Sequence, residues 1–122
     1  MSDLNINTRE QAGVTVLDLS GKIALGETSQ QLHSDLRALA DKGNKNILIN
    51  LSKIRTIDSS GLGTLVAGYT TIERAGGQLK LTNLSDRASE LMTITKLYTV
   101  FEVFDDENAA INSFGKAGEA AG

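Results

Sequence analysis

Apolar and polar positions along the chain follow two periods, which predict strands and helices in turn. Residues 4–8 alternate between asparagine and residues suited to a buried face, a pattern typical of a half-buried strand. Residues 14–19 form a second, mainly apolar run after a short turn, so the two strands predict a hairpin. Later apolar spacing predicts further strands at residues 46–51, 77–81 and 100–104, and helices at residues 28–43, 59–76, 85–95 and 105–115.

The order of these elements predicts an α/β protein built as one layered domain. Strands and helices alternate after the hairpin, which favours a mixed β-sheet of four to five strands with about four α-helices. Residues 46–51 are almost continuously apolar, as expected for a central strand covered on both faces. We expect the domain to span residues 1–114. Residues 115–122 are small or polar and predict a flexible C-terminal tail, with Gly115 ending the last helix.

Composition and charge exclude several classes of function. The 122 residues carry a net charge of −3, and the basic residues do not cluster along the sequence, so nucleic-acid binding is not expected. The absence of cysteine excludes disulfides, thiolate metal sites and a catalytic thiol. No apolar segment is long enough for a signal peptide or a membrane span. We therefore expect a cytoplasmic protein with no cofactor, no metal and no membrane association.

The stretch DSSGLG at residues 58–63 is the main candidate for function. It follows the apolar strand 46–51 and a connector, and it opens the second helix. Ligand sites of open α/β sheets lie beyond the carboxyl ends of such strands. A serine N-cap would account for either Ser59 or Ser60, but not for both. Gly61 and Gly63 are poor helix formers and suggest a surface that another backbone can approach.

Catalytic interpretations of this stretch do not fit the residues. A hydrolase elbow requires G-x-S-x-G, which neither serine satisfies. His33, the one histidine, is expected on a solvated helix face and to be neutral to function. No phosphate-binding loop with G-x-x-x-x-G-K-[ST] is present. Residues 105–107, all acidic, suggest either a cation site or a charged helix start, and the helix start is favoured, with Asp105 or Asp106 as its cap.

The DSSGLG stretch, with the hairpin and the strand ILINL before it, resembles the phosphorylation-site signature of STAS domains, the family of bacterial anti-sigma factor antagonists. The resemblance implies a partner switch and not an enzyme. The unmodified protein binds an anti-sigma factor that is also a serine kinase, phosphorylation releases it, and a serine phosphatase resets it. Ser59 is then the phosphoacceptor. The implied partner-binding residues are Asp58, Ser59, Ser60, Gly61, Leu62 and Gly63, and we expect the Leu62 side chain to be partly exposed.

One position departs from the family pattern. Many relatives carry an acid three residues after the glycine that closes the second strand, where this chain has Ala24, and Glu27 is the nearest substitute. Two alternatives therefore stay open. The chain could be a STAS module of another complex, such as a transporter-associated subunit or a stress-signalling scaffold, or it could be a weak nucleotide-binding protein. The sequence does not determine the oligomeric state.

Overall fold

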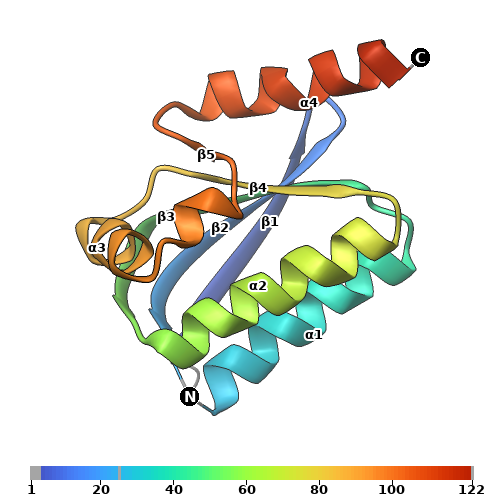
Figure 1. Ribbon diagram of the computed structural model, residues 1–122. Helices are drawn as coiled ribbons and strands as arrows, with labels where there is room; N and C mark the ends of the chain where they lie inside the picture. Colours follow the sequence, from blue (N-terminus) through green and yellow to red (C-terminus); the bar gives the residue numbers. More distant parts are fainter. Residues whose placement is uncertain (1–3, 25, 122) are drawn as a thin grey trace.

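The structure, a computed structural model, describes residues 4–24 and 26–121, with side chains described through Phe114 (Figure 1). A five-stranded sheet has the order β1-β2-β3-β4-β5; β1 is antiparallel to β2, and the other neighbours are parallel. This confirms the predicted α/β class and the mixed sheet. The strands are β1 (Leu4–Gln11), β2 (Val14–Ile23), β3 (Asn46–Ile57), β4 (Gln78–Thr82) and β5 (Val103–Phe104). The helices are α1 (Glu27–Asp41), α2 (Ser59–Arg74), α3 (Asp86–Thr95), the 3-10 turn η1 (Leu97–Thr99) and α4 (Glu107–Ala121).

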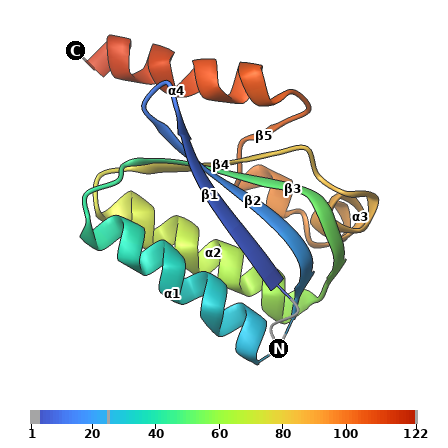
Figure 2. The same cartoon turned by 180° about the vertical axis from the view of Figure 1, so that it is seen from behind.

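Helices cover the two faces of the sheet unequally. Helices α1 and α2 lie side by side on one face, whereas α4 crosses the other face, and α3 lies beside the carboxyl end of β3 (Figures 1 and 2). Both cores use β3. Ile47, Ile49 and Leu51 belong to the core under α1 and α2, and Leu48 packs with residues of α4. The continuous apolar run thus reflects a strand buried on both faces, as predicted. Within the described residues, no helix combines the length and apolar character needed to cross a bilayer.

Several predicted boundaries are wrong, and the first two strands end at Gln11 and Ile23 instead of residues 8 and 19. Strand β3 continues to Ile57 because Ile54 and Ile57 are buried and Ile57 still pairs with Ile23 of β2. The predicted strand at 100–104 is reduced to Val103–Phe104. Helix α4 continues past Gly115, since a glycine costs a helix only about 1 kcal/mol and the alanines that follow are the best helix formers. Gly122 lies outside the described residues, and flexibility of residues 115–122 stays a prediction.

Thr28 and Ser29, the hydroxyl residues at the start of the first helix, do not cap it. Gly26 is the N-cap of α1 and provides no side-chain bond. The hydroxyls of Thr28 and Ser29 lie inside the first turn and reach back to the loop instead. Thr28 Oγ1 accepts a hydrogen bond from the amide of Ala24 (3.0 Å), and Ser29 Oγ donates to the carbonyl of Ala24 (2.6 Å). The two hydroxyls therefore bond the backbone of Ala24 rather than cap the helix.

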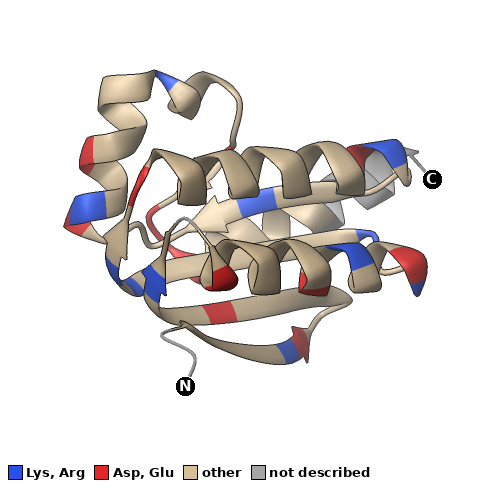
Figure 3. Cartoon of the chain, turned by 90° about the horizontal axis from the view of Figure 1, so that it is seen from below, with Lys and Arg blue, Asp and Glu red and all other residues tan. Residues whose placement is uncertain are grey.

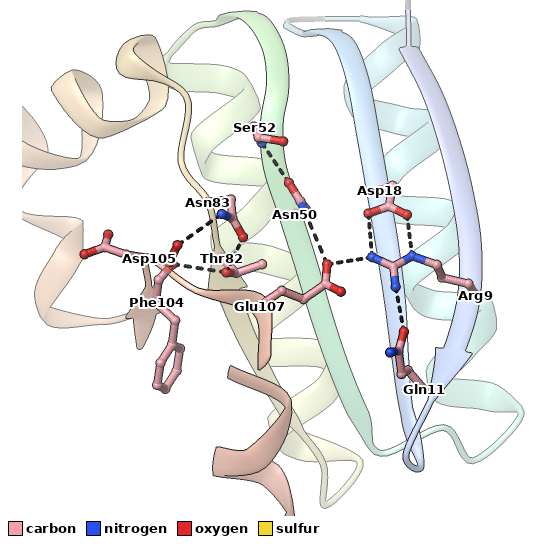
Figure 4. A network of polar contacts seen from close by, with 10 residues as sticks. All are labelled: Arg9, Gln11, Asp18, Asn50, Ser52, Thr82, Asn83, Phe104, Asp105 and Glu107. Atoms are coloured by element: carbon pink, nitrogen blue, oxygen red, sulfur yellow. Dashed lines mark hydrogen bonds and ion pairs between the residues drawn. The ribbon is translucent and has the colours of Figure 1, made fainter. Parts of the chain in front are cut away.

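A polar network joins the start of α4 to the sheet (Figure 4). Arg9 Nε donates to Asp18 Oδ2 (2.6 Å), and Arg9 Nη2 donates to Glu107 Oε1 (2.5 Å). The pKa of the Arg9 guanidinium is raised above its ordinary value. The hydrogen bond to Asp18 is the largest cause, and the hydrogen bond to Glu107 is the second. Asp106 accepts from the amide of Ala109 (3.0 Å) and caps the helix. The acidic run is thus a charged helix start, as the sequence analysis favoured.

We expect the apolar contacts of α4 to outweigh this network. Phe114→Ala should lower the free energy of unfolding by roughly 3–5 kcal/mol, because the ring is 2% exposed and its removal leaves a cavity. Arg9→Gln should cost about 1 kcal/mol or less, since its side chain is 34% exposed and solvent screens the ion pairs. Urea denaturation of both variants measures the difference. Equal losses would show that the polar network is the main attachment.

Candidate functional site

The candidate site begins where β3 ends and α2 starts. Asp58 has extended backbone (φ −107°, ψ −178°) and is the N-cap of α2. Its Oδ1 accepts a hydrogen bond from the amide of Gly61 (2.7 Å), and its carbonyl accepts from the amide of Leu62 (2.9 Å). The predicted serine cap is therefore wrong. A carboxylate serves well here because it also lies at the positive end of the helix dipole.

With Asp58 as the cap, both serines become free for other roles. Ser59 and Ser60 occupy the first two positions of α2, and both side chains are exposed. Neither hydroxyl forms a hydrogen bond with another residue of the described chain. The structure thus presents two adjacent hydroxyls to solvent at a rigid position, the first turn of a capped helix.

Close packing against β2 fixes the start of α2. The amide of Asp58 donates to the carbonyl of Ile23 (3.3 Å), and a Cβ atom on Gly61 would overlap that same carbonyl group. Gly61 is buried, and the packing of α2 against β2 requires a glycine at this position. Gly63 is exposed, and a Cβ atom there would meet nothing within 4 Å. The interpretation of the glycines as an open surface is right for Gly63 and wrong for Gly61.

Leu62 does not lie on the surface. Its side chain is 3% exposed and belongs to the core under α1 and α2. The predicted partial exposure is wrong because the helix starts at Ser59, which turns Leu62 toward the sheet one turn before Leu65. On the same helix face, Leu65 and Ile72 are buried, and Val66 and Tyr69 are half-buried against the core. The Leu62 side chain therefore forms no part of a docking surface.

A shallow depression of about 440 Å³ lies between the first turns of α1 and α2. Ser60 and Gly63 border it from α2. His33 borders it from α1 and is half-buried, so the expectation that it lies on a solvated face is corrected. The complete lining is Ser29, Gln30, His33, Ser60, Gly63, Thr64 and Ala67. No signal in the sequence placed the α1 residues here, because they are separated from the DSSGLG stretch by a whole strand.

At Ala24, where many relatives carry an acid, two hydroxyls of α1 bond the backbone. Both backbone groups of Ala24 are bonded by the hydroxyls of Thr28 and Ser29, so Ala24 is held in place without an acidic side chain. Glu27 is exposed in the first turn of α1. Glu27 therefore places a carboxylate at the start of α1, three residues after the position of the family acid.

Comparisons with known proteins agree with this geometry. A family model described as the STAS domain matches residues 5–110. The anti-sigma-B factor antagonist of Bacillus subtilis is 29% identical over 101 residues, which cover 83% of this chain and 91% of the relative. An anti-sigma factor antagonist from Mycobacterium paratuberculosis has a similar structure (TM-score 0.78, 19% identity, 91% of this chain and 93% of that one). So does the phosphorylated form of the Bacillus cell fate determinant SpoIIAA (TM-score 0.69, 19% identity, 89% and 98%).

The N-cap can be tested by mutation. Asp58→Ala should lower the free energy of unfolding by at least about 1 kcal/mol, because the amide of Gly61 loses its acceptor. Asp58→Asn should lose less, since its amide oxygen can still accept. Ser59→Ala and Ser60→Ala should change stability by no more than about 0.5 kcal/mol, as is usual for exposed sites. A larger loss in either serine variant, measured by urea denaturation, would show that a serine takes part in the cap.

The two glycines should respond in opposite ways. Gly61→Ala should destabilise the fold by about 1–3 kcal/mol or more, because the Ile23 carbonyl is backbone and cannot move aside easily. Gly63→Ala is the matched control in the same turn and should be neutral or stabilising by up to about 1 kcal/mol. Thermal and urea denaturation give both values. A tolerated Gly61→Ala would mean that α2 can shift away from β2.

Proposed function

The chain belongs to the STAS domain family, and on that basis we propose that it is an anti-sigma factor antagonist controlled by phosphorylation. In its unmodified form it binds an anti-sigma factor that is also a serine kinase. Phosphorylation of Ser59 by that kinase separates the complex, and a serine phosphatase restores binding. The observation that carries this proposal is the exposed, unbonded hydroxyl of Ser59 directly after the capping Asp58.

The exposed residues around Ser59 define the docking surface that we propose. Ser59, Ser60 and Gly63 present it from α2, and the depression beside them extends it toward Ser29 and Gln30 of α1. Asp58 and Gly61 contribute indirectly, because they set the position of the helix. The depression can receive a side chain of the partner, while Gly63 lets the partner's backbone come close.

Phosphorylation would weaken such an interface for physical reasons. A phosphate adds roughly −1.5 to −2 charges at the centre of the docking surface, beside the carboxylate of Asp58. Burial of that charge against a desolvated or acidic partner is unfavourable. A loss of about 3–4 kcal/mol would weaken binding a few hundredfold or more. The fold itself would tolerate the modification, because an anion at a helix N-terminus is favourable.

In this role the chain is a substrate of the kinase and not itself an enzyme. It needs no cofactor and makes no direct contact with nucleic acid. It acts in the cytoplasm, where sigma factors work. The anti-sigma factor antagonists among its relatives support this proposal, since one of them matches 83% of the chain.

The test uses the anti-sigma factor kinase encoded in the same genome, with ATP and mass spectrometry. Wild type and Ser60→Ala should be phosphorylated on Ser59, whereas Ser59→Ala should bind the kinase without being modified. Ser34→Ala, an exposed serine of α1, is the control and should behave as wild type. Phosphate on Ser60, or on no serine, would refute the assignment.

The switch itself is tested with phosphorylated wild-type protein, because one aspartate charge in Ser59→Asp is a weak mimic of a dianion. Calorimetry should show that phosphorylation weakens binding to the kinase a few hundredfold. Tight binding by the phosphorylated protein would end the proposal of a switch, whichever serine carries the phosphate.

A further inference from the structure

An apolar patch is exposed at the end of α3 and in the turn that follows it. Among the described residues, the large apolar side chains that remain exposed are those of Ile94 (69%), Tyr98 (55%) and Val100 (38%). They run from the last turn of α3 to the residue after η1. Exposed apolar residues are ordinary when they are scattered singly, but a group of them marks an interaction site. These three residues are here called the η1 patch.

The η1 patch lies beside α2. Val100 and Tyr69 of α2 line one hollow of about 260 Å³, and the ring of Tyr69 packs edge-on against the ring of Phe101, with centroids 5.4 Å apart. Tyr69 follows Ser59 by ten residues on the same helix, which corresponds to about 15 Å along the helix axis and about 80° around it. The η1 patch therefore begins on the order of 20 Å from Ser59.

One partner of ordinary size can cover both Ser59 and the η1 patch. A standard interface takes about 800 Å² from each protein, which corresponds to a face about 28 Å across. Such an interface also takes about 20–30 residues from each side. Two copies of the chain that meet only through this patch of three residues therefore bury too little to hold a stable dimer. The size of the patch thus favours a different protein that also covers α2.

The surface that joins them carries almost no charge. Residues 59–72 contain no charged side chain, and Lys96 is the one charged residue of the stretch 91–101. In Figure 3, α2 is free of charged residues up to its last turn, whereas the neighbouring α1 carries several. The centres of protein interfaces are depleted of charged residues and enriched in tyrosine. This composition therefore favours a partner that presents apolar side chains. The exposed residues of α2 between 59 and 72 are Ser59, Ser60, Gly63, Ala67 and Thr70.

We propose that the η1 patch is the apolar centre of the interface with the anti-sigma factor kinase, and that Tyr98 is its main contact. The inference rests on the proposed function, because it takes that kinase as the partner. Tyr98 packs against an apolar surface of the partner, and Ile94 and Val100 exclude water around it. The patch itself is uncharged, so a phosphate on Ser59 acts on another part of the same interface.

The experiment measures surface plasmon resonance between the full-length, unmodified chain and the anti-sigma factor kinase encoded in the same genome. Tyr98→Ala should weaken binding roughly 30-fold or more, as is usual for truncation of a central tyrosine. Ile94→Thr should weaken binding roughly fivefold. Both losses should lie in the dissociation rate, with the association rate changed less than about threefold, because neither variant removes a charge. Asn112→Ala, an exposed residue of α4 on the opposite face of the sheet, is the control and should bind as wild type.

Urea denaturation confirms that each variant is folded, and Ile94→Thr keeps the test decisive if Tyr98→Ala unfolds. Binding of both variants with the affinity of wild type would overturn the inference and leave the proposed function intact. Failure of wild type to bind the kinase would overturn both. Sedimentation equilibrium of the free protein tests a second copy as the occupant of the patch, and we expect a monomer. A wild-type dimer that Tyr98→Ala dissociates would overturn the inference, as would an equal loss of kinase binding in Asn112→Ala.

Discussion

The packing of Gly61 against the carbonyl of Ile23 is the constraint on which the site depends. The contact joins the first turn of α2 to the end of β2 with no room for a Cβ atom between them. It therefore fixes where α2 begins and turns Leu62 into the core. With the helix start fixed, Asp58 lies at the N-cap, and its carboxylate satisfies the amide of Gly61. Both serines are then left exposed, with their hydroxyls available for chemistry.

Helix α4 packs on one face of the sheet, and the candidate site lies at the first turns of the helices on the other face. The core under α1 and α2 and the smaller core under α4 meet at β3, whose side chains serve both. Helix α4 is attached to the face of the sheet opposite α1 and α2 (Figures 1 and 2). It therefore leaves the first turns of α1 and α2 uncovered. This arrangement suits a protein whose proposed role is to present one rigid surface to successive partners.

The proposed switch would change charge without changing fold. A phosphate on the first residue of a capped helix meets a favourable dipole, so the domain has no reason to unfold or rearrange. Its effect would be confined to the surface, where it adds negative charge beside Asp58. A partner would therefore encounter the same shape with a different electrostatic potential, which is sufficient to alter affinity by several kcal/mol.

The sequence by itself determined the kinds of element and their order. The alternation at residues 4–8, the apolar run 46–51 and the leucine spacing after residue 28 report local faces, and these gave the hairpin, the central strand and the helices. The resemblance of the DSSGLG stretch supplied the family. Only the tertiary structure decided which residue caps α2, that Leu62 is buried, and that α1 residues border the site. The reason is physical: periodicity fixes side-chain directions within an element, but the start of a helix and the neighbours of a strand depend on contacts between residues far apart in sequence, such as Gly61 with Ile23.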